Sequence, residues 1–281
     1  MIKVNDPVQI KYGSCKNFNI LNLTSVYRKI RAVFFKQNEI DGIKLLKSDT
    51  YLVSYPKSGN TWIRFLLINY FLNPNRNKIN YTDLEDFIPS IHKSTAEQIN
   101  NLKGFRIIKS HFVKNEYPKI IYIVRDGRDA LVSYYYFLRD LKHFEGSFEE
   151  FYNSRSFGDI GDWDVHVRAA IDYQETHPEK IIIVAYEDLK NDTSAIFKRV
   201  IKFLGHSIDL DVLNLAIDIS TFKTLKNMQK KGGVSIENKE VDFFRKGLSG
   251  QWEEYFTDEM NTDFIQKSKD LLEMFGYKVN T

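Results

Sequence analysis

The stretch from Tyr51 to Leu72 places an apolar, β-prone run, a short polar loop and a helix-like run in direct succession. The loop over residues 55–62 reads Tyr-Pro-Lys-Ser-Gly-Asn-Thr-Trp. A helix that begins just after a strand directs its free backbone N–H groups and its positive dipole end at one point. Lys57 adds a positive charge there, and Ser58 and Thr61 add hydroxyl donors. The stretch therefore predicts a strand-end loop that binds a phosphate or sulfate group.

This loop differs from the nucleotide-binding Walker A loop, which has the pattern G-x-x-x-x-G-K-[ST] with lysine after the second glycine. Here Lys57 precedes Gly59, which is the only glycine of the loop. A phosphotransferase or NTPase of the P-loop class stays open as an alternative function. An ordinary strand–helix turn, in which Pro56 and Gly59 only reverse the chain, is the alternative without any ligand.

Strands and helices alternate along the rest of the chain. Further short apolar runs predict strands at 105–109, 119–124 and 180–186. The last two runs are continuously apolar, as in parallel strands that are covered on both faces. Helical patterns lie between and after them, at 129–141, 163–176 and 193–204. The alternation predicts a three-layer α/β fold, with a central parallel sheet and helices on both faces. Ligands bind such sheets beyond the carboxyl ends of the strands.

A chain of 281 residues is long enough for one large α/β domain. We expect a single domain over residues 1–281, in which residues 1–48 form an N-terminal extension that packs on the core. An amphipathic patch between Ser25 and Phe35 is a candidate helix for that packing. Cys15 is the only cysteine, which excludes an intramolecular disulfide and a cysteine-rich metal site.

The charge balance does not suggest a nucleic-acid-binding protein, because 40 Lys and Arg residues face 37 Asp and Glu residues, for a net charge of +3. Residues 1–22 lack the apolar core of a signal peptide. No run approaches the ~20 apolar residues that a membrane span needs. We therefore expect a soluble, cytoplasmic protein without stable membrane insertion.

A second cationic position follows the apolar run at 119–124. Arg125 comes directly after that run, and Ser133 lies eight residues later, about two turns of helix. A planar guanidinium can hold a phosphate through two parallel hydrogen bonds, and a hydroxyl can add a third contact. We expect the neighbouring Arg128 and Asp129 to pair with each other at the surface, as charge runs usually do.

Lys109, Ser110 and His111 mark the end of the strand predicted at 105–109. A histidine at a strand end can act as a general base, because its pKa lies close to the working pH. A structural role for a lone histidine is the alternative. The six histidines show no zinc-binding spacing such as His-Glu-x-x-His, so no metal site is predicted.

A third basic stretch lies near the C-terminus. Arg245 and Lys246 are adjacent cations, and Gly247 and Gly250 follow them. Two glycines allow such a loop to close over an anion. A solvated turn is the alternative for this stretch alone.

Taken in their order along the chain, these motifs resemble those of the cytosolic sulfotransferases, which use 3′-phosphoadenosine 5′-phosphosulfate (PAPS). The resemblance covers roughly residues 50 to 257. Residues 56–62 look like the family's PKSGTTW loop for the 5′-phosphosulfate, and residues 109–111 look like the Lys-Thr-His that contains its catalytic base. The donor contacts that the loop implies are Lys57, Ser58, Gly59, Asn60, Thr61 and Trp62.

Further stretches are similar to family segments that contact the nucleotide. Arg125 and Ser133 resemble the pair that binds the 3′-phosphate, and Tyr186 resembles a tyrosine near the adenine. The other implied nucleotide contacts are Ser220, Thr221, Phe222, Arg245, Lys246 and Gly247. The resemblance thus implies a P-loop-NTPase-like sulfotransferase fold with a nucleotide held at both of its phosphate ends.

The resemblance also implies a mechanism. The sulfuryl group would move from PAPS to a hydroxyl or amine of a small-molecule acceptor by in-line displacement. The nucleotide product would be 3′-phosphoadenosine 5′-phosphate (PAP). Lys57 would neutralise charge on the leaving oxygen, and Lys109 would neutralise charge on the sulfuryl oxygens. His111 would take the proton from the acceptor, and no metal would be required. A module that only binds the nucleotide is disfavoured, because it would not need His111. The segments expected to face the acceptor are 81–104, 137–162 and 227–244.

The chain departs from the family pattern at several positions. Asn60 replaces a threonine of the phosphosulfate loop, and Gln251 replaces an aspartate of the C-terminal motif. Phe112 and Val113 replace a Leu-Pro pair after the base, which suggests a differently shaped acceptor mouth. Residues 253–262 do not match the family's dimer motif, so the oligomeric state is left open.

Overall fold

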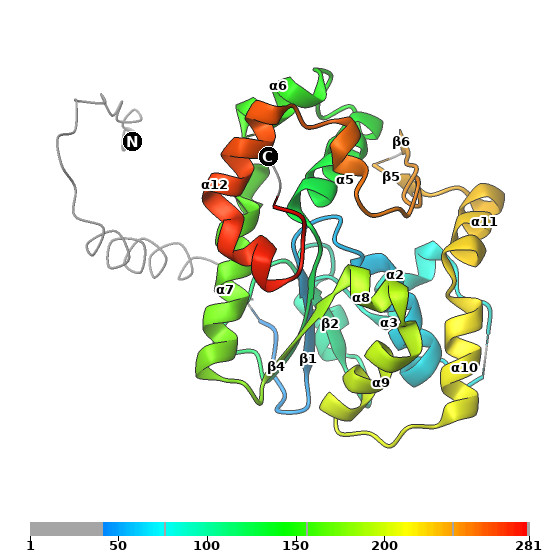
Figure 1. Cartoon of the computed structure of the whole chain (residues 1–281). Helices are drawn as coiled ribbons and strands as arrows, with labels where there is room; N and C mark the ends of the chain where they lie inside the picture. Colours follow the sequence, from blue (N-terminus) through cyan, green and yellow to red (C-terminus); the bar gives the residue numbers. More distant parts are fainter. Residues whose placement is uncertain (1–41, 76, 156, 238, 280–281) are drawn as a thin grey trace, which may run out of the picture. The chain divides into compact units, whose positions relative to one another are not determined.

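Residues 42–279, apart from residues 76, 156 and 238, are described by the structure, a computed structural model (Figure 1). Cys15 and the amphipathic patch between Ser25 and Phe35 lie outside the described residues, and so does most of the expected N-terminal extension. Within the described part of the chain, no helix combines the length and the apolar character needed to cross a membrane.

The core of the fold is a four-stranded sheet in which every neighbouring pair is parallel. Its strands are β1 (Thr50–Ser54), β2 (Ile107–Ser110), β3 (Lys119–Val124) and β4 (Ile181–Ala185). They lie in the order β2-β1-β3-β4. The bounds of β3 are those predicted, whereas β2 begins two residues later than the run at 105–109 suggested.

Helices cover both faces of the sheet. One face packs against α2 (Asn60–Leu67), α8 (Tyr186–Asn191) and α9 (Thr193–Phe203), and the other against α7 (Trp163–Thr176), with α12 (Asp258–Met274) beyond it. Figure 1 shows α7 and α12 on one side of the strands and α2, α8 and α9 on the other. The predicted three-layer α/β fold is therefore confirmed.

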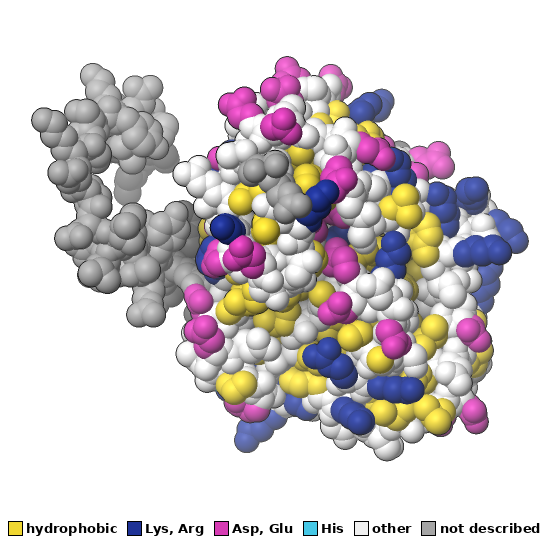
Figure 2. Space-filling view, in the orientation of Figure 1, with side chains coloured by type: hydrophobic (Ala, Val, Ile, Leu, Met, Phe, Trp, Pro, Cys, Tyr) yellow, Lys and Arg dark blue, Asp and Glu magenta, His cyan; other side chains and the backbone are white. Residues whose placement is uncertain are grey.

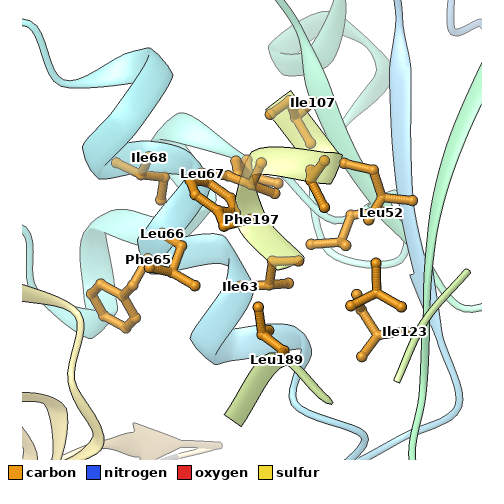
Figure 3. Packing of buried hydrophobic residues seen from close by; sticks show 14 of the residues in the cluster. Leu52, Ile63, Phe65, Leu66, Leu67, Ile68, Ile107, Ile123, Leu189 and Phe197 are labelled. Carbon is orange, nitrogen blue, oxygen red and sulfur yellow. The ribbon is translucent and has the colours of Figure 1, made fainter. Parts of the chain in front are cut away.

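The larger apolar cluster lies between the sheet and α2, α8 and α9. Figure 3 shows Leu52 and Ile123 of the sheet directed toward Ile63 of α2 and Leu189 of α8, with Phe197 of α9 nearby. All five side chains have at most 1% of their surface exposed. Burying one such aliphatic side chain stabilises the fold by about 1.5–3 kcal/mol relative to exposure.

Side chains cap most of the other helices. The other helices are α3 (Leu84–Phe87), α4 (Ala96–Asn100), α5 (Gly127–Asp140), α6 (Phe148–Ser154), α10 (Leu210–Ile219) and α11 (Phe222–Gly232). Asp126 caps α5 and Thr221 caps α11 by accepting backbone N–H bonds. A short hairpin of β5 (Ser235–Ile236) and β6 (Lys239–Glu240) follows α11. One-turn 3₁₀ segments lie at Tyr81–Asp83, Gly158–Ile160 and Gln251–Glu254.

Two predicted helices differ from the structure at their ends. The helix predicted over 62–72 begins earlier, at Asn60, and its last five residues, Ile68–Leu72, form a π-helical turn. The helix predicted from Asp129 begins at Gly127, because the Asp126 carboxylate accepts the Arg128 N–H and so nucleates the first turn. Both changes bring helix N-termini closer to the ends of β1 and β3.

Candidate active site

The strand order places the predicted motifs beside one another at the carboxyl edge of the sheet. Val53 pairs with Ser110, so His111 follows β2 next to the loop that follows β1. Ser54 pairs with Ile123, so Arg125 follows β3 on the other side of the same loop. β4 pairs with β3 and ends at Ala185, directly before Tyr186. Four strand ends therefore place His111, the loop at 55–62, Arg125 and Tyr186 in one row.

The loop after β1 combines left-handed backbone positions with a buried polar side chain. Lys57 and Gly59 both adopt left-handed backbone conformations, with φ of 64° and 98°. Ser58 is fully buried, and in the described part of the chain neither its Oγ nor the Asn60 Oδ1 has a hydrogen-bond partner. Buried polar atoms are normally hydrogen-bonded. The Ser58 hydroxyl can donate to a phosphate or sulfate group, and the N-terminus of α2 adds backbone N–H donors, whereas Asn60 Oδ1 only accepts and cannot bind an anion.

The Lys57 ammonium lies between two aromatic rings. Its Nζ is 3.7 Å from the centroid of Phe243 and 4.5 Å from that of Phe137. Burial lowers the pKa of Lys57 to about 7, and the positive charges of Arg125 and Lys109 act in the same direction. An anion bound in this loop would raise that pKa again, because it favours the charged form.

His111 is held with one ring nitrogen free for proton transfer. Its Nδ1 lies 3.2 Å from the Ser54 carbonyl oxygen. A carbonyl only accepts, so Nδ1 carries the proton and Nε2 carries the lone pair of a base. Burial, and then the positive charge of Lys109, hold the pKa of His111 well below its usual value. The imidazole is therefore neutral at neutral pH, as a general base must be.

Lys109 is a second cation, close in sequence to His111. Its pKa is lowered to about 8, first by burial and then by the positive charge of Arg64. Arg64 itself is buried and donates to the carbonyl oxygens of Leu84 and Ile88, at 2.8 and 2.5 Å. The sequence alone did not indicate Arg64, because nothing local distinguishes it from a solvated residue on α2.

Arg125 spans the gap between the phosphate loop and the C-terminal basic loop. Its guanidinium donates to the carbonyl oxygens of Lys57 at 3.1 Å and Leu248 at 2.9 Å. The guanidinium also lies 4.7 Å from the centroid of the Tyr186 ring. Among the described residues its buried Nε has no hydrogen-bond partner. Ser133 is half-buried on α5, eight residues further along.

The expected surface pair of Arg128 and Asp129 is wrong. Both side chains are buried, and the Arg128 guanidinium pairs with Asp126 at 2.7 Å. The Asp129 carboxylate instead accepts backbone N–H bonds from Gly250 at 2.7 Å and Trp252 at 3.0 Å. The Asp129 carboxylate thus attaches the C-terminal basic loop to α5, whereas Arg128 pairs with the residue that caps this helix.

That C-terminal loop brings Arg245 and Gly247 to the site. The Arg245 guanidinium lies over the Tyr136 ring at 4.3 Å and donates to Gln251 Oε1 at 3.0 Å. Gly247 has a φ of 64°, and a Cβ there would collide with the Phe222 ring. Lys246, in contrast, is exposed and pairs with Glu254, so the structure does not bring it to the other site residues.

Aromatic and backbone groups gather at the end of the site that the resemblance assigns to the adenine. The Trp62 indole donates to the Ser220 carbonyl oxygen at 2.9 Å, and its ring meets the Tyr186 ring edge-on at 5.8 Å. Thr221 is exposed, and its hydroxyl oxygen accepts the Thr224 N–H at the start of α11. Trp62, Ser220 and Tyr186 thus lie together, whereas Thr221 caps a helix.

Positive charge flanks the C-terminal loop. Figure 2 shows Lys and Arg side chains gathered over α11. The exposed lysines of this helix are Lys223, Lys230 and Lys231. The ammonium of Lys226 donates to the Arg245 carbonyl oxygen at 2.5 Å, which ties α11 to the loop. Such a cationic surface raises the local concentration of an anionic ligand. In the described part of the chain, no group of three or more His, Cys, Asp or Glu side chains could hold a metal ion.

Comparison with known proteins identifies similar chains. Residues 47–276 match the family described as "Sulfotransferase domain". The Mus musculus protein named Sulfotransferase 1 family member D1 is 29% identical over 262 residues, which cover 83% of this chain and 88% of the mouse protein. Flavonol 4'-sulfotransferase of Flaveria chlorifolia is 31% identical over 278 residues, which cover 83% of this chain and 84% of the plant protein.

Solved structures share the fold. A retinol dehydratase in complex with androsterone and inactive cofactor PAP has a TM-score of 0.67 at 22% identity, over 88% of this chain and 85% of that chain. A mouse sulfotransferase, SULT7A1, complexed with PAP has a TM-score of 0.64 at 22% identity, over 85% of this chain and 88% of that chain. At these identities the likeness concerns the fold alone.

Proposed function

The chain belongs to the sulfotransferase domain family, and we propose that it transfers the sulfuryl group of PAPS to a small-molecule acceptor with His111 as the general base. The enzyme is a PAPS-dependent sulfotransferase, and PAP is its nucleotide product. The base, the acceptor and the individual site residues are the proposed parts. A cytoplasmic location also stays a prediction, which fractionation of cells would test.

One observation supports this mechanism above the others. His111 Nδ1 binds the Ser54 carbonyl oxygen, and the Arg125 guanidinium binds the Lys57 carbonyl oxygen, on opposite sides of the phosphate loop. Hydrogen bonds therefore join the loop on one side to His111, the proposed base, and on the other side to Arg125, which is proposed to bind the 3′-phosphate. Its unsatisfied Ser58 Oγ and the unsatisfied Arg125 Nε suit a donor with two separate anionic groups.

Each catalytic side chain has a distinct task. Bound PAPS supplies the sulfuryl group. His111 Nε2 takes the proton from the acceptor hydroxyl or amine, Lys57 neutralises charge on the leaving oxygen, and Lys109 neutralises charge on the sulfuryl oxygens. By analogy with phosphoryl transfer, the transition state is loose, so positioning and charge stabilisation supply most of the acceleration. These roles need no metal ion.

The acceptor is proposed to have a flat, apolar body that carries the hydroxyl or amine. Tyr81, Phe137 and Phe243 each come from a different one of the three segments expected to face the acceptor. Their rings meet at Phe243, with centroids 5.1 Å from Tyr81 and 5.9 Å from Phe137, beside the Lys57 ammonium. The names of the similar proteins, a flavonol sulfotransferase and an androsterone complex, point to the same class of compound. Screening phenols, sterols and amines for a sulfate mass shift would test the class.

Arg125→Ala is expected to weaken PAP binding by about 10- to 100-fold, because one charge-assisted, two-point contact is worth about 1.5–3 kcal/mol. Binding of adenosine 5′-phosphate, which lacks the 3′-phosphate, should change by less than about threefold on the same scale. Isothermal titration calorimetry with the two nucleotides would measure the difference. Equal losses for both would contradict the assignment of Arg125 to the 3′-phosphate.

Gly59→Ala is expected to weaken PAP binding and to destabilise the fold by about 1–3 kcal/mol, the usual cost of a strained backbone position. The φ of Gly59 is 98°, and a Cβ would lie 2.5 Å from the Tyr186 ring, so the loop must move. Gly205→Ala is the matched control, because its φ is 86° but a Cβ would meet nothing within 4 Å. Calorimetry and thermal unfolding would compare the two variants. PAP binding that is equally strong in both would count against close packing of the loop on Tyr186.

A further inference from the structure

His166 is a buried residue of α7 that the proposed mechanism does not use. Its side chain lies on the face of the sheet opposite the larger apolar cluster, and 6% of its surface is exposed. The ring Nε2 is 2.5 Å from the carbonyl oxygen of His111, and Nδ1 is 2.6 Å from the hydroxyl of Tyr122. His166 therefore connects a strand of the sheet to the backbone of the proposed base.

These contacts define which atoms of His166 carry protons. The His111 carbonyl can only accept, so His166 Nε2 must donate to it. Burial lowers the pKa of His166 to about 4, so the ring stays neutral and Nδ1 is bare. The Tyr122 hydroxyl then donates to Nδ1; its other neighbour, the His166 carbonyl oxygen, is farther away at 3.4 Å. The ring of Tyr55 meets the imidazole edge-on at 5.4 Å.

The contacts form one directed chain of hydrogen bonds. Tyr122 of β3 donates to His166 of α7, His166 donates to the carbonyl of His111, and His111 donates to the carbonyl of Ser54 in β1. We propose that His166 is a positioning residue for the catalytic base, because it holds the peptide of His111 while Ser54 holds the ring. This inference rests on the proposed role of His111 as the base.

The place of His111 in the sheet explains why such a support matters. β2 is the last strand of the four-stranded sheet; its pairing with β1 ends at Ser110, and the bridge to Ser90 on its other side is at Lys109. The carbonyl of His111 thus lies beyond the last paired residue. A displacement of about 1 Å at a reacting group can lower a rate by about 10²-fold. A buried donor at this carbonyl restrains the base where the strand pairing no longer does.

Two substitutions of nearly equal shape distinguish the effect of losing the hydrogen bond to His111 from the effect of changed packing. In His166→Gln the side-chain amide can still donate to the His111 carbonyl, whereas in His166→Met it cannot. We expect kcat to fall by about 10²-fold in His166→Met and to stay within about fivefold of wild type in His166→Gln. The KM for the acceptor and the Kd for PAP should change by less than about threefold in both variants, because the hydrogen bonds of the His166 ring go to Tyr122 and to the backbone of His111 and not to the residues assigned to the nucleotide.

A second measurement tests the inference on the unmodified enzyme. Nitrogen-15 NMR of labelled histidines should show the proton on Nε2 of His166 and on Nδ1 of His111. The opposite tautomer at either residue would overturn the inference, even if a variant failed to fold. Tyr122→Phe removes the donor to His166 Nδ1 and should shift that nitrogen resonance without loss of PAP binding.

The kinetic outcomes distinguish this inference from the proposed function. If His111→Ala is inactive and His166→Met has the same kcat as His166→Gln, the positioning role fails and the base assignment stands. If His111→Ala keeps normal turnover, the base assignment fails, and the positioning role fails with it. A fall in kcat confined to His166→Met, with unchanged PAP binding, supports both.

Discussion

His111→Ala is expected to lower kcat for sulfuryl transfer by about 10²–10⁴-fold, the range in which general bases contribute. The bond from Nδ1 to the Ser54 carbonyl leaves Nε2 as the basic nitrogen, so the alanine variant loses the proposed proton acceptor. PAP binding should change by less than about threefold, since the nucleotide contacts are assigned to other side chains. Single-turnover kinetics and calorimetry would measure the two quantities separately.

Two further variants make this result specific. His111→Asn keeps an N–H donor that can reach the Ser54 carbonyl but has no basic nitrogen, so it should be as inactive as the alanine variant. His177→Ala is the control for the loss of an imidazole, because His177 precedes β4 at the opposite edge of the sheet and should not affect turnover. Normal turnover in His111→Asn would remove His111 from the proton-transfer step.

Lys57→Met is expected to lower kcat by about 10²–10³-fold, the usual cost of losing one preorganised group that stabilises transition-state charge. Methionine nearly matches lysine in length and can still pack between Phe137 and Phe243. The loss should therefore report the missing charge rather than a cavity. Rates measured at saturating PAPS would isolate the chemical step from donor binding.

The lowered pKa of Lys57 predicts the direction in which kcat/KM changes with pH. Burial lowers the pKa of Lys57 to about 7 in the free enzyme, so its positive charge is present below that pH and is lost above it. The kcat/KM for PAPS should therefore decline as pH rises through about 7, whereas kcat should decline only at higher pH, because a bound anion raises the pKa. Lys57→Arg stays charged and should lack the decline near pH 7. If Lys57→Arg showed the same decline of kcat/KM near pH 7 as the wild type, that decline would belong to a group other than Lys57.

Local pattern was enough to predict the elements that carry the site. The bounds of β3 and α7 agree with the predicted ones, and the loop at 55–62 joins a strand to a helix as expected. Periodicity and turn residues act over a few neighbouring positions, so a single sequence contains them. The family resemblance rested on the same short, ordered motifs, and the match over residues 47–276 agrees with it.

Other features depend on residues far apart in the chain. Arg128 and Asp129 look like a surface pair, yet Asp129 is buried and binds the backbone of Gly250 and Trp252. No local signal at His166 indicates that its ring meets the carbonyl of His111, 55 residues earlier. The lowered pKa of Lys57 likewise follows from its burial and from the charges of Arg125, directly after β3, and Lys109, in β2.

Short-range propensities thus specified the four strands of the main sheet and several of the helices, and the ordered motifs, through the family they resemble, specified the kind of reaction. The order β2-β1-β3-β4, which brings His111 and Arg125 to opposite sides of the Lys57 loop, arises only when the strands pair. The physical reason is that burial, charge coupling and hydrogen bonding at the site act through space. Residues that share no local pattern acquire a common environment only after the sheet has formed.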